Sequence, residues 1–596
     1  MQTITEQITE ELKGAFTACG YDAEQIRATL SNRPDLCEYQ CNGAMPLAKT
    51  AHKAPIVIAG EAADKLKDSE RFEEASAVRP GFLNLKLKEE YLISFLNKMA
   101  SSDKLGYDAA LGDAAKTIVM DYGGPNVAKP LHVGHLRSAV IGESIKRILR
   151  YAGHQVIGDV HLGDWGLQMG LIITELSERR PDLVYFDPDY VGDYPQEAPF
   201  TVSELEEIYP TASGKSKEDP EYKDRALEAT AQLQAGRRGY RAILDQILNV
   251  SVSDLKRNYE NLNVSFDLWY GESDAQKYVP DMIGRFVSEG WAYESEGALV
   301  VDISQEGDKK ELPPCIVRKS DGASLYATTD LATLVQREQD FHPDMVIYVV
   351  DKRQELHFTQ VFRTAKKTGI VRPKTQLVFK GFGTMNGKDG KPFKTRAGGV
   401  MRLEYLLDEI NAEMLKKIED NYAAHGKAAP DHEETLQTAK IVGLSALKYG
   451  DLSNQASKDY VFDIDRFTSF EGNTGPYILY TIVRIKSILR GYRSEVAEAL
   501  PDEITVTGNP AAKELMLQMV RWNGVIAEAV SETAPHRICA FLYDLSNAFN
   551  HFYHETPILS EKDPALRDSY IALLELCRRV LETGIDLLGF EAPEHM

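Results

Sequence analysis

The chain has 596 residues, of which 43% are hydrophobic and 27% are charged. This length exceeds what one hydrophobic core usually supports, so we expect roughly three or four domains. The apolar content excludes a disordered chain, because it is sufficient to build packed cores. Acidic residues number 90 and basic residues 68, and the resulting net charge of −22 by itself argues against a nucleic-acid partner.

Apolar stretches and cysteines both bear on the compartment in which the protein works. No apolar stretch approaches the roughly 20 residues that cross a bilayer, and residues 1–20 lack the apolar centre of a signal peptide. The six cysteines form no C-x-x-C pair and have neither zinc-ligand spacing nor the density of a disulfide framework. We therefore expect reduced thiols, no metal bound by the protein, no membrane partner and a cytoplasmic location.

Along the first 112 residues, apolar periodicity predicts a mixture of helices and strands. The expected elements are helices over residues 4–19, 54–67 and 89–99 and a strand over residues 81–87. Residues 101–115 contain two glycines and two serines and are typical of a linker.

A strand expected at 117–122 begins a different pattern, because it runs through a Gly-Gly-Pro turn into a helix expected at 134–151. Further strands are expected at 155–160, 298–303, 345–350 and 376–379. Strands that alternate with helices predict a parallel α/β sheet, here interrupted by a large insertion. From residue 403 onward the pattern is almost wholly helical, which predicts a separate bundle.

Charge is distributed unevenly along the chain. Residues 181–310 contain 26 acidic and 13 basic residues, whereas residues 361–400 contain ten basic residues and one acidic residue. The basic stretch ends in the segment GKDGKPFKTRAGG (387–399). A glycine-flanked loop that presents cations suits a polyphosphate, although an ordinary solvated basic face is an equally good interpretation.

The segment PNVAKPLHVGH (125–135) lies where the first strand of the predicted sheet feeds its first helix. A helix start at the carboxyl end of a parallel strand offers free N–H groups and a positive dipole end to a phosphate. His132 and His135 are three residues apart and share a face, and Gly134 between them leaves room for a flat base. Their imidazoles can donate hydrogen bonds to charge that develops on a phosphate, while ordinary capping histidines are the alternative.

At these residues the chain resembles a known family. His132-Val133-Gly134-His135 resembles the HIGH signature of class I aminoacyl-tRNA synthetases, and the loop at 393–398 resembles a degenerate KMSKS signature. Within that class, segment 125–135 is most similar to the arginyl-tRNA synthetases. The segments LGDWG (162–166) and DLWY (267–270) agree with the same family, and the resemblance covers essentially the whole chain.

The resemblance implies a fold with an α/β catalytic domain of Rossmann type, built on a doubly wound parallel sheet, between an α+β N-terminal domain and an all-α C-terminal bundle. The implied regions are an N-terminal tRNA-binding domain at 1–112, the catalytic domain at 113–400 with its insertion at about 181–310, a connecting helical segment at 401–440 and an anticodon-binding domain at 441–596.

The family joins ATP and L-arginine into arginyl-adenylate and transfers the arginyl group to the terminal adenosine of tRNA(Arg). The resemblance therefore implies these three partners, Mg²⁺ accompanying ATP as a co-substrate, activation that requires tRNA, and a monomer. Because the nucleophile is the substrate's own carboxylate, the protein mainly positions the reactants and stabilises charge on the phosphates.

The resemblance also implies which residues contact ATP and which are catalytic. The residues implied for ATP binding are Pro125, His132, Gly134, His135 and Lys391, and those implied for catalysis are Lys129, His132, His135, Lys394 and Arg396. Thr395 stands where the second lysine of KMSKS is expected, and Lys129 occupies the position of a lysine thought to compensate for it in this family. Whether Lys129 or the Lys394–Arg396 loop replaces the missing lysine stays open at this stage.

The guanidinium of arginine requires carboxylates, preferably in bidentate geometry. Tyr326 and Asp330 lie four residues apart, so one helical turn aligns them, and by resemblance they face the guanidinium. Asn126 and Gln354 are implied at the amino-acid end of the substrate. Without the resemblance, a solvated residue near a helix start is a better interpretation of Asp330 than a substrate contact.

The chain departs from its relatives at two positions near the Gly-Asp-Trp element. Val160 stands where many relatives have Asn and Gln155 where they have Glu, so neither is placed in the site, and Asp159 or His161 is a candidate replacement. In the C-terminal helices, several side chains are candidates to stack on anticodon bases, with packing in the bundle core as the alternative. They are Tyr477, Tyr480, Arg484, Phe549 and Tyr553.

Two other classes of protein deserve comparison. A small-molecule adenylyltransferase uses a similar H-x-G-H turn, but such enzymes are usually much shorter and lack a helical RNA-binding end. A non-catalytic, synthetase-like RNA-binding protein is the main alternative, and it is expected to have lost the residues that contact ATP. Both histidines and Lys129 are present here, which favours an active ligase.

Overall fold

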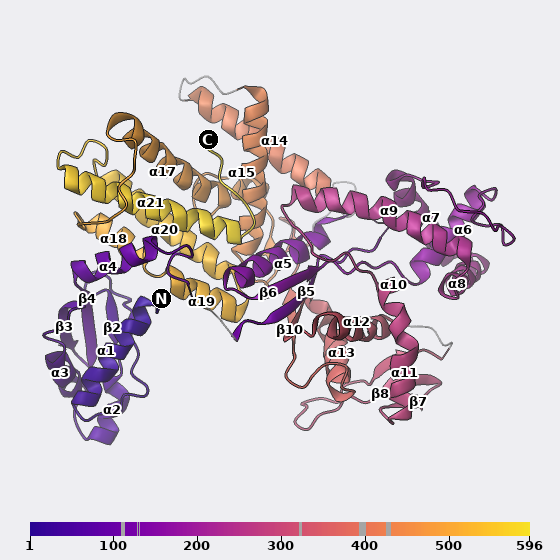
Figure 1. Cartoon of the computed structure of the whole chain (residues 1–596), viewed down its shortest axis with the longest axis horizontal. Helices are drawn as coiled ribbons and strands as arrows, with labels where there is room; N and C mark the ends of the chain where they lie inside the picture. Colours follow the sequence, from indigo (N-terminus) through magenta and orange to yellow (C-terminus); the bar gives the residue numbers. More distant parts are fainter. Residues whose placement is uncertain (109–113, 128, 130, 321–324, 392–400, 425–430) are drawn as a thin grey trace. The chain divides into compact units, whose positions relative to one another are not determined.

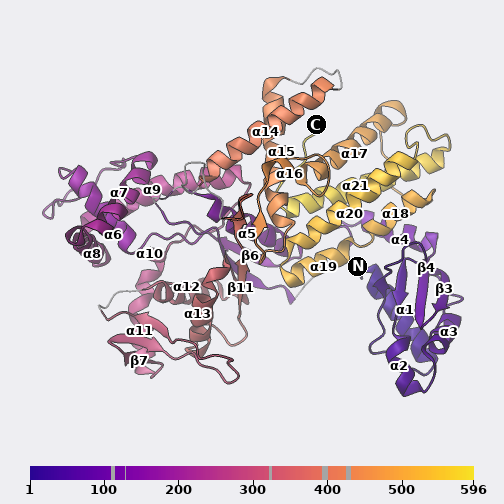
Figure 2. The same cartoon turned by 180° about the vertical axis from the view of Figure 1, so that it is seen from behind.

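The structure is a computed structural model that describes residues 1–596 except 109–113, 128, 130, 321–324, 392–400 and 425–430. It consists of two compact units (Figures 1 and 2). Unit 1 combines residues 1–110, 469–587 and 591–596, and unit 2 combines residues 111–468 and 588–590. None of the described helices is long and apolar enough to span a membrane.

The N-terminal part of unit 1 packs helices against an antiparallel sheet of strand order β1-β2-β4-β3. The helices are α1 (Ile4–Ala18), α2 (Ala44–Ala51), α3 (Pro55–Lys65) and α4 (Glu89–Ala100), and the strands are β1 (Thr29–Leu30), β2 (Tyr39–Cys41), β3 (Phe72–Val78) and β4 (Phe82–Leu87). The three predicted helices and the strand at 81–87 are confirmed. Helix α1 begins with a capping box in which Thr3 and Glu6 exchange hydrogen bonds, a pattern that stabilises helix starts.

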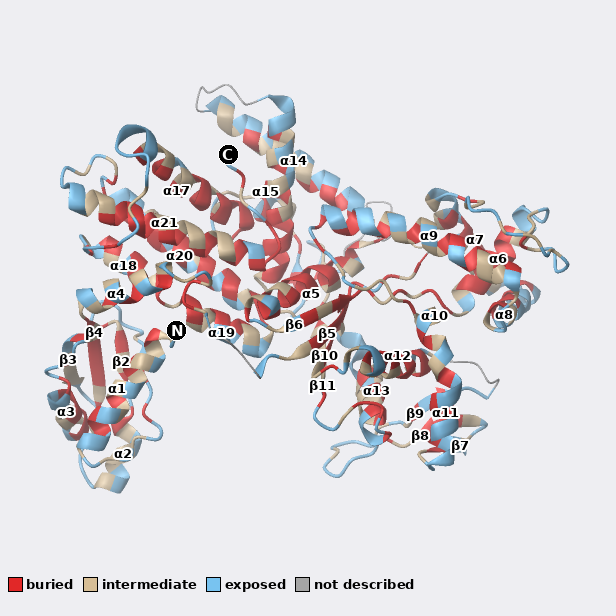
Figure 3. Cartoon of the chain, viewed as in Figure 1, coloured by how far each residue is buried: buried red, intermediate tan, exposed pale blue. Residues whose placement is uncertain are grey.

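The C-terminal part of unit 1 is helical, as expected from residue 403 onward. Its helices are α17 (Gly475–Glu495), α18 (Pro510–Met519), α19 (Trp522–Glu532), α20 (Pro535–Glu555) and α21 (Pro564–Leu587). Apolar stripes of α17, α20 and α21 pack together, and these stripes are the buried faces in Figure 3. Burial of such stripes, more than intrinsic helix propensity, stabilises helices of this kind.

Unit 2 contains the predicted parallel sheet, with strand order β11-β10-β5-β6. The strands are β5 (Thr117–Tyr122), β6 (Gln155–Asp159), β10 (Met345–Asp351) and β11 (Gln376–Phe382), and all three pairings are parallel. Helix α5 (Val133–Tyr151) connects β5 to β6 and packs against both strands and β10. This is the doubly wound arrangement expected from the strand–helix alternation.

The central strands β5 and β10 are buried on both faces, which explains why they are nearly continuous apolar runs. Val346 and Tyr348 of β10 and Val119 of β5 join one apolar cluster with helices α12 (Tyr326–Phe341) and α13 (Glu355–Lys367). Alternate residues such as Ile347 and Val349 are equally buried. A short three-ten helix, Lys352–Gln354, lies between β10 and α13.

One predicted strand belongs elsewhere. Residues 298–303 were expected in the parallel sheet, but β8 (Ala298–Val301) pairs antiparallel with β7 (Ala292–Ser295) and β9 (Cys315–Arg318) in a separate three-stranded sheet. The expectation was wrong because an apolar strand of four residues carries no signal for pairing direction. The antiparallel pairing of β7 and β8 is set by the tight turn between them, in which Glu296 and Gly297 both have positive φ.

The insertion is mainly helical. Helix α6 (Leu167–Arg179) precedes it, and its own helices are α7 (Val202–Glu218), α8 (Pro220–Gln234), α9 (Arg238–Asn261), α10 (Glu272–Ala275), a three-ten turn at Gln276–Tyr278 and α11 (Val279–Ser288). Helices α7, α8 and α9 pack around α6, and both views show the four side by side (Figures 1 and 2). The remaining elements of unit 2 are β12 (Met385–Asn386), α14 (Leu403–Ala424), α15 (His432–Leu452), β13 (Tyr460–Val461) and α16 (Ile464–Phe467).

Candidate active site

A cavity of about 650 Å³ opens where the parallel strands of unit 2 end. Its walls include the ends of β5, β10 and β11, the start of α5 and the first turns of α12. The carboxyl edge of an open parallel sheet is where ligands bind in α/β folds. The cavity is therefore placed where the chemistry of the strand-to-helix segment was expected.

His132 and His135 form one end of this cavity. His132 is the N-cap of α5, and its ring stacks on that of His135 with centroids 3.9 Å apart. The Nδ1 of His132 accepts a hydrogen bond from the backbone N–H of Gly134 at 3.0 Å, and the Nδ1 of His135 accepts one from the N–H of His132 at 3.2 Å. A side chain at residue 134 has no space, because its Cβ would lie 2.7 Å from the His132 ring.

These contacts determine the protonation of both imidazoles. Burial, together with the positive charge of Lys129, lowers the pKa of His132, and burial, with His132 and Lys129 nearby, lowers the pKa of His135 to about 3. Both rings are therefore neutral near pH 7. Because each Nδ1 accepts a hydrogen bond, each proton resides on Nε2, which leaves one N–H donor per ring.

Lys129 does not line the cavity, but its charge reaches both histidines, and its Nζ lies 4.5 Å from the ring centroid of Tyr209 on α7. The other residues implied for phosphate contact are differently placed. Lys391 is exposed at the end of a turn in which its carbonyl accepts a hydrogen bond from the N–H of Gly387, and it does not line the cavity. Pro125 does not line the cavity either, and its carbonyl accepts a hydrogen bond from the N–H of Gly163 at 3.0 Å. Lys394 and Arg396 lie outside the described residues.

A second part of the cavity lining is acidic and is called the acidic end. Asp330, Glu272 and Asp121 line it, and Tyr326 lies near its mouth with 73% of its surface exposed. The Asp330 carboxylate contacts the Nε2 of His357 at 2.5 Å. Tyr326 and Asp330 do share the first turns of α12, as the four-residue spacing predicts.

Glu272 was not found from the sequence, although it follows the DLWY segment by two residues. Asp164 of the Gly-Asp-Trp element positions it, because the Asp164 carboxylate accepts hydrogen bonds from the N–H of Ser273 at 2.9 Å and from its hydroxyl at 2.5 Å. Burial raises the pKa of Glu272 to about 8, and the nearby Asp330 and Asp164 raise it while His161 lowers it. A partly protonated carboxyl therefore faces the cavity near pH 7.

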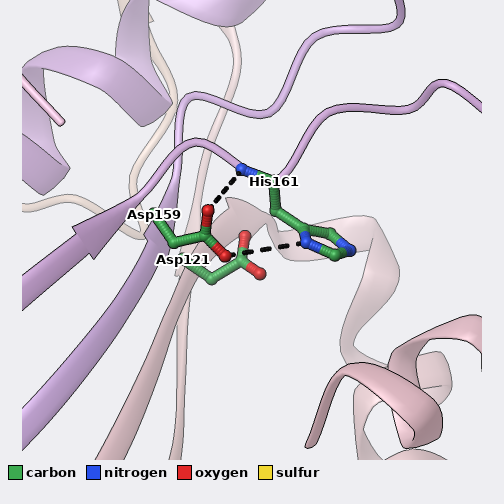
Figure 4. Close-up of side chains that lie close together, drawn as sticks. All are labelled: Asp121, Asp159 and His161. Carbon is green, nitrogen blue, oxygen red and sulfur yellow. Dashed lines mark hydrogen bonds and ion pairs between the residues drawn. The ribbon is translucent and has the colours of Figure 1, made fainter. Parts of the chain in front are cut away.

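Beneath the acidic end lies a buried charge network (Figure 4). Arg337 on α12 donates one hydrogen bond to Asp121 and one to Asp159, each 2.7 Å long. His161 adjoins the same carboxylates, with its Nδ1 3.7 Å from Asp159, and despite burial these acids raise its pKa to about 9. The oxygen and nitrogen atoms of Asp121, Asp159 and His161 are close enough together to hold a metal ion, but Arg337 and the protonated His161 already neutralise the two carboxylates.

The structure also shows where the residues implied for the amino-acid end of the substrate lie, and where the two departures from the family pattern lie. Asn126 and Gln354 both line the cavity, and Gly163 packs so closely on Asn126 that a Cβ there would lie 2.3 Å from the Asn126 Oδ1. Val160 is fully buried, and Gln155 begins β6 at the sheet edge opposite the cavity. Neither belongs to the site, whereas His161, named as a candidate replacement, lines the cavity.

In the described part of the basic stretch, residues 361–391, several cations are paired with carboxylates. Arg363 pairs with Asp308, Arg372 with Glu338, and Lys388 with Asp463 and Asp465 at 3.0 and 3.1 Å. These pairs neutralise part of the local excess of positive charge. The Lys388 contacts also hold the turn that precedes residue 392 against the segment after β13.

In unit 1, α17 and α20 present a polar and aromatic surface. Arg484 lies between the rings of Tyr480 and Tyr553, at 4.6 and 4.8 Å from their centroids, and donates to Asn550 at 2.8 Å. Tyr477 donates a hydrogen bond to Asn547 at 2.7 Å. Phe549 was a candidate for stacking on bases, but it is fully buried, because its position on α20 faces the bundle core.

Family comparisons agree with this architecture. Residues 96–464 match the family described as tRNA synthetases class I (R), catalytic domain. The chain belongs to the arginyl-tRNA synthetase family. In this synthetase, residues 2–87 match the arginyl tRNA synthetase N terminal domain and residues 478–596 match the DALR anticodon binding domain.

Relatives of the synthetase extend over its full length. A protein of Agathobacter rectalis named arginine–tRNA ligase is 62% identical, and one of Alkaliphilus oremlandii with the same name is 54% identical, with all of both chains covered in each case. Crystal structures of the arginyl-tRNA synthetases of Plasmodium falciparum and Thermus thermophilus superpose with TM-scores of 0.82 and 0.77. These two are 23% identical over 100% of both chains, and they confirm the fold.

Proposed function

We propose that the 650 Å³ cavity binds L-arginine and ATP side by side and joins them into arginyl-adenylate. As a member of the arginyl-tRNA synthetase family the chain is a class I arginine–tRNA ligase. The observation that carries the residue assignment is the lining of the cavity, which combines carboxylates with two neutral imidazoles whose pKa the charge of Lys129 helps to lower. A guanidinium suits the carboxylates and a triphosphate suits the imidazoles.

The reaction needs no nucleophile from the protein. The arginine carboxylate attacks the α-phosphorus of ATP, the bond to the β-phosphate oxygen breaks, and pyrophosphate leaves with the electron pair. The Nε2–H groups of His132 and His135 donate hydrogen bonds to the phosphate oxygens as their charge grows, and Lys129 adds a positive charge. Neutral donors in a buried, preorganised arrangement lose no proton in this step.

The acidic end recognises the arginine side chain. Asp330 and Glu272 accept hydrogen bonds from the guanidinium, with the Tyr326 hydroxyl at the rim of the cavity. Asn126 and Gln354 bind the amino and carboxylate end of the substrate and thereby bring its carboxylate toward the histidines. Asp164, which touches Ser273 and not the cavity, is a positioning residue for Glu272.

Mg²⁺ that accompanies ATP is held in this proposal by the phosphates. The carboxylates of Asp121 and Asp159 do not fit as its ligands, because Arg337 already donates a hydrogen bond to each of them. Lys391, Lys394 and Arg396 are assigned to the pyrophosphate end only as members of the degenerate KMSKS loop.

The acylation partner is tRNA(Arg). The surface of Tyr477, Tyr480, Arg484 and Tyr553 on α17 and α20 is proposed to stack on anticodon bases, since planar aromatic and guanidinium groups suit unpaired bases. The N-terminal domain is proposed to touch the outer corner of the tRNA. We further propose a monomer that works in the cytoplasm.

The amino-acid specificity is tested by charging total tRNA separately with each of the twenty amino acids in the presence of ATP. Arginine is expected to be esterified to tRNA, with one AMP and one pyrophosphate released per ester bond. Charging of another amino acid in place of arginine contradicts the assignment of the acidic end.

Glu272 predicts a pH dependence of arginine use. Its pKa of about 8 means that the carboxyl is mostly protonated near pH 7, and only the carboxylate attracts a guanidinium. We expect kcat/KM for arginine to rise roughly eightfold between about pH 7 and about pH 8.5, following the ionised fraction of this group. The measurement is steady-state aminoacylation at fixed ionic strength across that range.

The matched variant is Glu272→Gln, which keeps the shape of the side chain and cannot ionise. It is expected to lower kcat/KM at about pH 8.5 and to flatten the profile. An unchanged slope in this variant assigns the pH dependence to another group, such as His161, and removes Glu272 from recognition.

A further inference from the structure

Helix α7 of the insertion contacts both segments that flank the signature residues. Glu206 and Tyr209 lie three residues apart on this helix and therefore share a face. Tyr209 contacts Lys129, which precedes the first signature, and Glu206 contacts Arg402, which follows the loop of the second. Neither residue of α7 belongs to a motif that the sequence made visible.

The Tyr209 contact is a cation–π interaction. The Nζ of Lys129 lies 4.5 Å from the centroid of the ring, within the roughly 6 Å over which the ring face attracts a cation. From this position the charge of Lys129 contributes to lowering the pKa of both His132 and His135. The ring therefore holds the ammonium group where its charge acts on the phosphate end of the cavity.

The Glu206 contact ties the same helix to the backbone of the signatures. Arg402 donates to the Glu206 carboxylate at 2.9 Å, and the Glu206 side chain is only 14% exposed. The segment around Arg402 pairs with the segment around His132, since Val133 donates to Met401 at 3.1 Å and Leu403 donates to Leu131 at 3.0 Å. Helix α7, the start of α5 and the start of α14 are thus joined by polar contacts.

The position of Tyr209 is itself determined by the insertion. Its ring packs against an apolar cluster of Leu171, Ala212, Tyr222 and Ala226, contributed by α6, α7 and α8. At the start of α7, Thr201 and Glu204 form a capping box. The ring is thus held by packing within the helices α6, α7 and α8, and it also contacts the Lys129 ammonium.

We propose that Tyr209 is a positioning residue for Lys129 in adenylate formation, and that the Glu206–Arg402 ion pair holds α7 in the register that this requires. The inference rests on the catalytic role proposed for Lys129. It assigns the insertion a part in the chemical step: helix α7 keeps the compensating lysine directed toward the phosphates when the chain lacks the second signature lysine.

The test compares Tyr209→Phe, Tyr209→Leu and Lys129→Met by pyrophosphate exchange with tRNA and by aminoacylation. Phe keeps the ring face and loses only the hydroxyl, so Tyr209→Phe is expected to stay within about twofold of the parent. Tyr209→Leu is expected to lower kcat about five- to tenfold with little change in the KM for arginine. Tyr240→Ala serves as a control. Tyr240 lies on α9 and makes a similar cation–π contact, with Arg237 4.1 Å from its ring centroid. It lines neither the 650 Å³ cavity nor the neighbouring cavity at α7.

A double variant separates positioning from a general structural effect. In the Lys129→Met background, Tyr209→Leu is expected to cost less than about twofold, because the cation that the ring positions is gone. An equal loss in both backgrounds, or a loss in Tyr209→Phe as large as that in Tyr209→Leu, overturns the proposal. If Lys129→Met itself retains full exchange activity, the catalytic role of Lys129 fails and the inference fails with it.

Glu206→Gln tests the second contact. This substitution is expected to lower kcat less than Tyr209→Leu does. In the double variant, Glu206→Gln is expected to add little to the loss of kcat caused by Tyr209→Leu, because both substitutions act through the position of α7. Full additivity of the two losses shows that the ion pair acts separately and removes Glu206 from the proposal.

Discussion

Replacing Asp330 with Asn is expected to lower kcat/KM for arginine by at least about 30-fold. Asp330 faces the cavity from the first turns of α12 and is held there by the 2.5 Å contact with His357. Asn keeps the shape and retains a hydrogen bond to His357, so the loss isolates the negative charge. Removing one partner of a desolvated, hydrogen-bonded charge pair costs roughly 2–5 kcal/mol, which corresponds to about 30- to 5,000-fold.

The measurement is steady-state aminoacylation with arginine varied and ATP and tRNA saturating. Asp340→Asn is the matched control, because Asp340 lies on the exposed side of the same helix, and it is expected to change kcat/KM by less than about twofold. The loss in Asp330→Asn should fall mainly on the KM for arginine, since the guanidinium does not take part in bond breaking. A loss confined to the KM for ATP contradicts the orientation of the two substrates in the cavity.

Replacing Arg337 with Met is expected to destabilise the catalytic unit by about 3–5 kcal/mol. The guanidinium is fully buried and donates to Asp121 and Asp159, so its removal leaves two buried carboxylates with only His161 beside them. Met keeps much of the apolar volume and removes the charge. Native-state hydrogen exchange of the amides in α12 and β10 measures this loss locally, which suits a chain with more than one unit.

The loss should depend on pH with a definite sign. Without Arg337, burial raises the folded-state pKa of Asp121 and Asp159 above the unfolded value of about 3.9, so the folded state then binds protons that the unfolded state releases. Stability of the variant relative to the parent therefore falls as pH rises through the range above about pH 4. A loss that is the same at about pH 5.5 and about pH 8 contradicts this account.

Arg225→Met is the control for the loss of an arginine as such. Arg225 pairs with Glu178 at 2.6 Å, but its side chain is 55% exposed, so the pair is solvated. Exposed ion pairs of this kind contribute less than about 1 kcal/mol. The contrast between the two arginines tests burial, since both donate to carboxylates.

The sequence by itself determined the local architecture of this synthetase. The strand expected at 345–350 and the helix expected at 134–151 are present as 345–351 and 133–151. Both are visible in the sequence, because a strand buried on two faces gives a continuous apolar run and a helix buried on one stripe gives an apolar repeat of about 3.6 residues. The H-x-G-H turn was recognisable for the same reason, since both histidines and the glycine lie within one helical turn. Asp330 and Tyr326 became candidates through resemblance and one turn of spacing.

Only the tertiary structure decided which distant residues complete the site. Glu272 is placed by hydrogen bonds from Ser273 to Asp164, more than 100 residues away along the chain. The partnership of Arg337 with Asp121 and Asp159 and the contact of Tyr209 with Lys129 likewise join separate elements. Periodicity does not encode such contacts, because they depend on how elements pack in space.

Net charge was the least informative property with which to begin. The value of −22 describes the average surface, and much of its excess lies in the insertion at 181–310. The excess of positive charge at 361–400 was read as cationic character, yet Arg363, Arg372 and Lys388 are paired with carboxylates from other segments. The sequence determined how many charges there are and where along the chain they lie, while the fold decided which are neutralised, because an ion pair forms between side chains that packing brings within a few ångströms of each other.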